Sequence, residues 1–176
     1  RILELGLNHE EQHQELLVTD IKYILGHNPL FPAYGDRNEG HAEKTEGKFI
    51  PIPGGLHAIG FAGPGFSFDN EHARHQLFLN DFAISDRLVT NGEFMAFMDD
   101  GGYEDFKHWH SDGWQWVQES KVQAPMYWHK VNGTWHHYTL KGLMAVDPGM
   151  PLCHISFYEA FAFTEWSGMR LPTEAE

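Results

Sequence analysis

Apolar and polar side chains follow a helical period over residues 1–27. On a wheel of about 100° per residue, with His9 at zero, the apolar residues share one broad arc and the charged residues lie opposite. The arc holds Ile2, Leu5, Leu16, Leu17, Tyr23 and Ile24, and the charged side holds Glu4, Glu11, Glu15 and Lys22. The pattern predicts one amphipathic helix that ends near Gly26 and Asn28-Pro29. A shorter helix capped by Asn8 is the alternative.

A single helix cannot bury its own apolar arc, so we expect bundle partners upstream of Arg1 or in another chain. Residues 28–47 carry Pro, Gly and charge without a sustained period, which predicts a linker and a domain boundary. We expect no secretory signal, since the chain starts at Arg1 with neither a charged n-region nor an apolar h-region. Thr173 and Glu176 form a capping box, which predicts that a further helix starts where the chain stops. We therefore expect an internal fragment of a longer protein.

The pattern changes at residue 48 to short strands. Residues 49–60 read as strand, tight turn, strand, and residues 76–79 and 82–84 predict short strands around Asn80-Asp81. Residues 100–153 are aromatic and mostly irregular, with clear strands only in the regions around 126–129 and 134–140, which Asn132-Gly133 joins as a hairpin turn.

Two helices are expected in the same region. Thr90 with Glu93 and Ser156 with Glu159 are capping boxes, and each precedes aromatic residues at helical spacing. Short strands, two helices and long loops together predict an α+β domain over residues 48–176.

Composition and charge narrow the function. The chain has 12 basic and 25 acidic residues and a formal net charge of −13, which argues against nucleic acid or an anionic membrane as the main partner. No run of about 18 apolar residues is present to span a bilayer. Cys153 is the single cysteine, which excludes an internal disulfide and favours a reducing cytoplasm.

His9 and His13 are the sharpest chemical signal. Side chains at i and i+4 lie about 40° apart on a helix, so both imidazoles can reach one transition metal ion. Both lie inside the apolar arc, where packing would supply a dry site. A third protein ligand is still required, and Asp20 lies about 10 Å further along the axis by the helical rise, too far for the same ion. The alternative for such a pair is two core histidines that only form hydrogen bonds.

His9-Glu10-Glu11-Gln12-His13 also fits the zinc-protease pattern H-E-x-x-H, with Glu10 as the general base. A zinc metalloprotease is therefore a second possible class. A third, without catalysis, is a lectin-like binding module in which residues 100–153 hold the ligand.

Residues 7–22, from Leu7-Asn8-His9 through Thr19-Asp20-Ile21-Lys22, resemble the last helix of the DinB-like four-helix bundle in ergothioneine-biosynthesis sulfoxide synthases. The remainder resembles the formylglycine-generating-enzyme (sulfatase-modifying-factor) domain, which has a C-type-lectin-like fold. The matching segments are Ile50-Pro51-Ile52-Pro53-Gly54-Gly55, Phe68-Asp69-Asn70-Glu71, Val89-Thr90-Asn91-Gly92-Glu93-Phe94, His154-Ile155-Ser156-Phe157-Tyr158-Glu159-Ala160 and Arg170-Leu171-Pro172-Thr173-Glu174-Ala175-Glu176.

The resemblance implies a non-haem iron(II) enzyme that joins hercynine (trimethylhistidine) to a thiol, cysteine or γ-glutamylcysteine, with O2, to give a sulfoxide. It implies that His9 and His13 bind Fe(2+) with a third histidine from an upstream helix, and that Gln12 contacts the substrate imidazole. Ovothiol-type 5-histidylcysteine sulfoxide synthase and selenoneine synthase share this architecture and remain alternatives. Formylglycine-generating activity depends on a cysteine pair, and Cys153 is alone.

Overall fold

The computed structural model describes residues 1–36 and 46–176, and part of the predicted 28–47 linker lies outside them. The chain divides into two compact units, which are described separately. The first contains Arg1–Leu25, Phe49–Ser85 and Pro172–Glu176, and the second contains Gly26–Lys48 and Asp86–Leu171.

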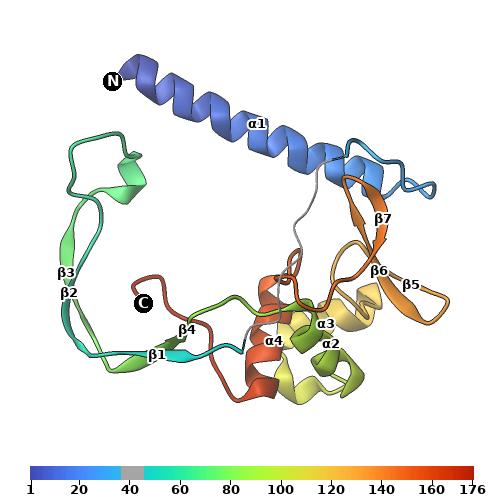
Figure 1. Cartoon of the computed structure of the whole chain (residues 1–176). Helices are drawn as coiled ribbons and strands as arrows, with labels where there is room; N and C mark the ends of the chain where they lie inside the picture. Colours follow the sequence, from blue (N-terminus) through green and yellow to red (C-terminus); the bar gives the residue numbers. More distant parts are fainter. Residues whose placement is uncertain (37–45) are drawn as a thin grey trace. The chain divides into compact units, whose positions relative to one another are not determined.

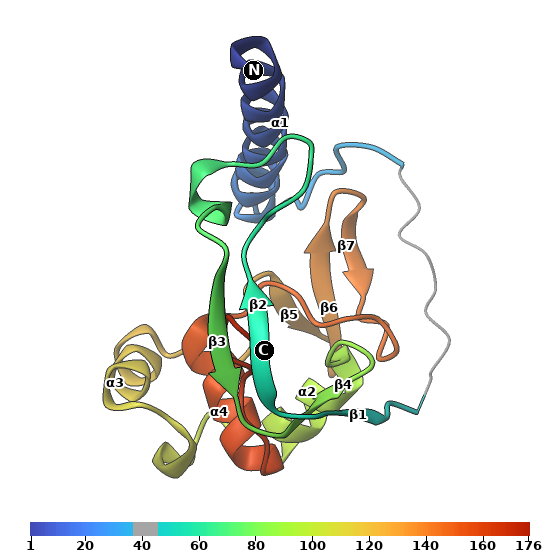
Figure 2. The same ribbon diagram turned by 90° about the vertical axis from the view of Figure 1, so that its left-hand side faces the viewer.

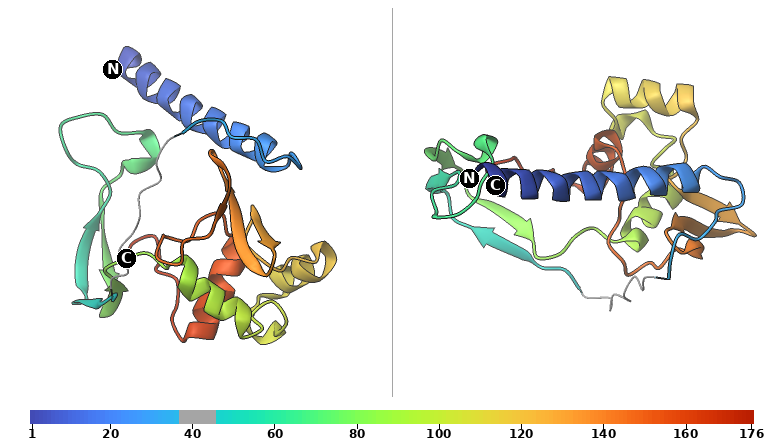
Figure 3. Two further views of the ribbon diagram at one scale, coloured as in Figure 1. Left: turned by 45° about the vertical axis from the view of Figure 1, so that its right-hand side comes forward. Right: turned by 90° about the horizontal axis from the view of Figure 1, so that it is seen from above.

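The first helix, α1, runs over Ile2–Gly26 without interruption (Figures 1 and 3), which confirms the long amphipathic helix. Asn8 does not cap a shorter one, because its side-chain amide donates to the Glu4 carbonyl at 2.9 Å inside the helix. The apolar arc is exposed over the described residues; Leu16 and Leu17 keep 59% and 60% of their surface. Within residues 1–36 and 46–176, no helix has the length and apolar character needed to cross a membrane.

Four strands of the first unit form two antiparallel pairs. They are β1 (Phe49–Ile52), β2 (Gly55–Ile59), β3 (His75–Leu79) and β4 (Phe82–Ser85). The predicted strands are present, but β1 and β2 do not pair with each other: β1 pairs with β4, and β2 with β3 (Figure 2). The predicted tight turn is instead the place where β1 leads into β2 and, beside it, β3 leads into β4. There the Gly54 amide donates to Asp81 Oδ1 at 2.7 Å.

The second unit is built on three helices, α2 (Asn91–Asp99), α3 (Ser111–Ser120) and α4 (Phe157–Ser167). The capping boxes predicted at Thr90 and Ser156 are formed: their side chains accept from the amides of Glu93 and Glu159. Helix α3 was not predicted. Its N-cap residue, His110, makes no side-chain hydrogen bond to the helix, so the sequence carries no start signal there.

A sheet of β5 (Trp128–Val131), β6 (Thr134–Thr139) and β7 (Gly142–Ala145) completes this unit. The hairpin at Asn132-Gly133 is confirmed, since Val131 pairs with Thr134. Strand β7 was missed, so the 100–153 region is less irregular than predicted. The mixture of helices and small sheets confirms the α+β class.

A segment of the predicted linker packs on this sheet. The Tyr138 hydroxyl donates to the Pro32 carbonyl at 2.8 Å, and the Tyr34 amide donates to the Leu140 carbonyl at 2.7 Å. The Phe31 ring lies 4.7 Å from that of His129. Residues 31–35 therefore belong to the second unit.

An aromatic cluster forms the core of the second unit: Phe94, Phe97, Tyr103, Trp109, Val117, Ala162 and Phe163. The rings of Phe94 and Phe163 join α2 to α4, with centroids 5.7 Å apart. Gly102 lies directly against the Phe97 ring, where an added Cβ has no space.

We expect Gly102→Ala to destabilise the protein by about 1–3 kcal/mol, because its methyl group would overpack the Phe97 ring. Gly6→Ala is the matched control, since a Cβ at Gly6 meets no described atom within 4 Å and alanine favours a helix. Urea unfolding of both variants measures the difference. Equal stability of Gly102→Ala and the parent would contradict this packing.

Acid should weaken the start of α2. Arg87 donates to both carboxylate oxygens of Glu93, at 2.8 and 2.7 Å, and lowers the pKa of Glu93 from 4.5 to about 2. A lowered folded-state pKa stabilises the fold above pH 4.5, and this contribution is lost as the pH falls from about 4.5 to about 2. Because 41% of the Glu93 side chain is exposed, we expect about 1 kcal/mol.

Glu93→Gln should therefore lower stability at pH 7 and reduce its loss on acidification. Urea unfolding between pH 3 and 7 measures both effects. Glu165→Gln, at an exposed position of α4, is the control and should keep the parent's acid dependence. An unchanged pH profile in Glu93→Gln would count against the ion pair.

Candidate metal centre on the first helix

The histidine pair lies in the middle of α1, where backbone hydrogen bonds fix the spacing of the side chains. The rings of His9 and His13 have centroids 4.5 Å apart and stand edge to face at 82°. The helix thus brings the two imidazoles to the same place, as the i and i+4 spacing predicts. Neutral imidazole nitrogen is a common ligand of divalent transition metals, so the pair suits iron or zinc as part of a site.

Both histidines are exposed over the described residues, as is the apolar arc around them. The sequence predicts that they face a packed, dry interior, and nothing described in the first unit provides one. Among residues 1–36 and 46–176, no group of three or more His, Cys, Asp or Glu side chains could hold a metal ion. The described residues therefore supply two donors, and a third must come from elsewhere.

Gln12 precedes His13 and lies about 60° from His9 around the helix axis. Its side chain flanks the histidine face and is exposed. Glu10 is about 100° from His9 and about 60° from His13, so Glu10 and Gln12 flank the shared face at similar angles on opposite sides. Helix geometry therefore places both Gln12 and Glu10 beside the histidine pair, and the assignment of Gln12 to the substrate rests on the family resemblance.

The acidic and histidine side chains in the loop over residues 67–72 form hydrogen bonds within that loop. Glu71 Oε2 accepts the Phe68 amide at 2.8 Å, and Asp69 Oδ1 accepts the Asn70 amide at 3.0 Å. His72 Nε2 lies 2.8 Å from the Ser67 hydroxyl. These side chains order the loop that contains the short 3-10 helix Asp69–Glu71.

Comparison with known sequences places the chain in a family. Residues 36–176 match the sulfatase-modifying factor enzyme 1-like domain. The chain therefore belongs to this family of domains.

Similarity to individual proteins extends further along the chain. It is 34% identical over 175 residues to the hercynine oxygenase of Mycolicibacterium smegmatis, covering 98% of this chain and 40% of that protein. The hercynine oxygenase of Mycobacterium tuberculosis is 32% identical over 181 residues, covering 99% and 41%. The formylglycine-generating enzyme of Bos taurus is 29% identical over 142 residues, covering 73% and 38%. These findings confirm the family resemblance, and the chain spans about two fifths of the length of the hercynine oxygenases.

We predict that His9→Ala and His13→Ala each lower the iron(II) affinity of the full-length protein at least tenfold, because each removes one nitrogen donor. Anaerobic iron titration measures this affinity. Glu10→Ala is the control and should keep nearly the parent's iron content, because Glu10 is not among the proposed nitrogen donors. Unchanged iron binding in both histidine variants would refute the site.

Proposed function

We propose that the full-length protein is an iron(II)-dependent sulfoxide synthase of ergothioneine biosynthesis. It would form a C–S bond between hercynine and a cysteine-type thiol, with O2 as the oxidant. We also propose that the protein is located in the cytoplasm, as the single cysteine predicts.

One observation carries the proposal: the similarity to hercynine oxygenases includes the histidine helix. The alignment with the Mycolicibacterium smegmatis protein leaves only 2% of the chain outside, fewer residues than precede His9. Formylglycine-generating enzymes align over 73% of the chain. The wider similarity to hercynine oxygenases thus covers α1 as well as the family domain.

Residues of α1 would have two different roles, metal binding and substrate contact. His9 and His13 would hold the ion as neutral imidazoles, and a histidine from outside this chain would complete the set. Bound iron(II) would supply the redox chemistry that oxidises the thiol sulfur at the expense of O2. Gln12 would donate or accept a hydrogen bond at the hercynine imidazole and orient its carbon toward the sulfur. Holding both organic substrates beside one ion replaces a rare encounter in solution by proximity.

Burial of the apolar arc of α1 would also affect metal binding, because it would exclude water from the site. At an exposed site, water competes with the two histidines for coordination of the ion. Segments that pack on Leu16 and Leu17 would exclude water from the neighbouring turn of α1. The bundle partner expected from the sequence would therefore serve both packing and the site.

We expect oxygen uptake by the full-length protein only when hercynine and a thiol are both present. Gln12→Ala should raise the KM for hercynine about tenfold or more and leave the KM for the thiol nearly unchanged, because Gln12 is assigned to the imidazole. Oxygen-electrode kinetics measure both constants.

The same assay separates the alternatives. Uptake with histidine in place of hercynine would favour the ovothiol type, and turnover with a selenium donor the selenoneine type. Peptide hydrolysis that is lost in Glu10→Ala would favour the protease and overturn the proposal.

A further inference from the structure

The second unit contains a cavity of about 640 Å³ that is lined by both acidic and basic side chains. Its walls come from the end of α2, the loop that follows it, α3, the segment after α3, and the β5–β6 hairpin. This volume lies within the range of small-molecule sites, about 300–1,000 Å³. The cavity lies in the second unit, whereas the histidine pair is in the first.

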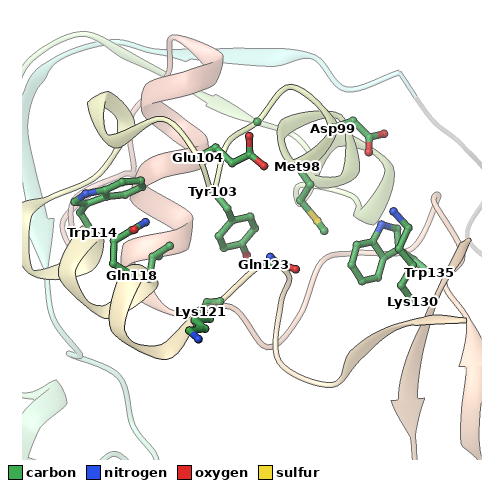
Figure 4. A pocket seen from close by; sticks show the side chains of 13 residues that line it. Met98, Asp99, Tyr103, Glu104, Trp114, Gln118, Lys121, Gln123, Lys130 and Trp135 are labelled. Atoms are coloured by element: carbon green, nitrogen blue, oxygen red, sulfur yellow. The ribbon is translucent and has the colours of Figure 1, made fainter.

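The cavity floor is apolar and partly aromatic. The buried side chains of Tyr103 and Val117 form its base, and Trp114 and Trp135 stand on two sides of it (Figure 4). The Tyr103 hydroxyl is directed away, since it donates to buried Glu159 Oε1 at 2.5 Å. The floor therefore offers ring faces and methyl groups, which suit the apolar body of a ligand.

Charged groups of opposite sign border this floor from different elements. Asp99 and Glu104 come from the end of α2 and its following loop, and Lys121 comes from the end of α3. Figure 4 shows the two carboxylates on one side of Tyr103 and the Lys121 amine on the other. Lys130 adds a second cation, 5.3 Å from the centre of the Trp135 ring. Figure 4 places Lys130 beside Trp135 and away from Lys121, so the cation opposite the two carboxylates is Lys121.

The polar side chains in this lining have unused hydrogen-bonding capacity. Within residues 1–36 and 46–176, no side-chain hydrogen bond or ion pair is formed by Asp99, Glu104, Gln118, Lys121 or Gln123. In the described part of the chain, neither acid forms an ion pair with Lys121 or Lys130. A ligand with both charges can complete both sides at once.

Lys121 also has an unfavourable backbone. It is the C-cap of α3 in the left-handed region, with φ 53° and ψ 42°. Glycine is the usual residue at such a position because it has no Cβ. A lysine that lines the cavity at a position suited to glycine indicates that its amine is needed there.

We propose that this cavity binds a zwitterionic small molecule of the amino-acid class. Its ammonium group would lie toward Asp99 and Glu104, its carboxylate toward Lys121, and its apolar side chain between the two indoles. The proposal rests on residues of the second unit alone and does not depend on the proposed function.

Calorimetry on the full-length protein tests this with three probes: L-phenylalanine, 2-phenylethylamine, which lacks the carboxylate, and 3-phenylpropionate, which lacks the amine. We expect L-phenylalanine to bind at least tenfold more tightly than either analogue. Glu104→Gln should weaken L-phenylalanine at least tenfold and leave phenylpropionate unchanged. Equal binding of the three probes, or no binding of L-phenylalanine, would overturn the proposal.

Lys121→Gly is the most discriminating variant. It removes the amine and relieves the left-handed backbone, so the midpoint of thermal unfolding should rise or stay the same while L-phenylalanine binding falls at least tenfold. Glu119→Gln, on the same helix but outside the cavity, is the control and should bind normally. Normal binding by Lys121→Gly would show that the lysine has no part in recognition.

Discussion

The buried carboxylate of Glu159 links the start of helix α4 to the loop that follows α2 in the second unit. One oxygen accepts the Ser156 amide at 2.7 Å and caps α4, while the other accepts the Tyr103 hydroxyl at 2.5 Å. Only 3% of Glu159 is exposed, so a lost partner would leave a buried charge unsatisfied. Tyr103 is thereby held in the loop after α2, where its ring meets Phe94 and Phe97. Burial beside this carboxylate raises the pKa of the Tyr103 hydroxyl, which keeps it a donor.

Local signals made α1, α2 and α4 predictable, and also the starts of α2 and α4. Thr90 with Glu93 and Ser156 with Glu159 need only three residues of sequence to be recognised, and both boxes form. Strand partners depend instead on contacts distant in sequence. The strands near Ile52 and Gly55 were predictable, but their pairing with Phe82 and Leu79 was not, because nothing local distinguishes a turn from a crossing between two pairs.

In the candidate site, too, the features set by local sequence were predictable and those set by distant contacts were not. The spacing of His9 and His13 is local, and the 4.5 Å separation of the rings follows from one helical turn. Their surroundings are not local: the sequence predicts a dry face, whereas both rings are exposed in the described chain. The cavity beside Tyr103 could not be predicted, because its lining comes from residues between 98 and 135 that the missed helix α3 brings together.

In the proposed enzyme, metal binding and burial of the apolar arc would be coupled. The stiff helix fixes two donors at little cost in ordering, so the affinity of the site depends on the third donor and on the exclusion of water. The exposed apolar side chains of α1 lie on the same arc as the histidines, and whatever covers Leu16 and Leu17 also covers the neighbouring turn with His13. A ligand bound only to the packed state stabilises that state. Iron would therefore strengthen the packing that keeps its own site dry, and loosening of that packing would weaken iron binding.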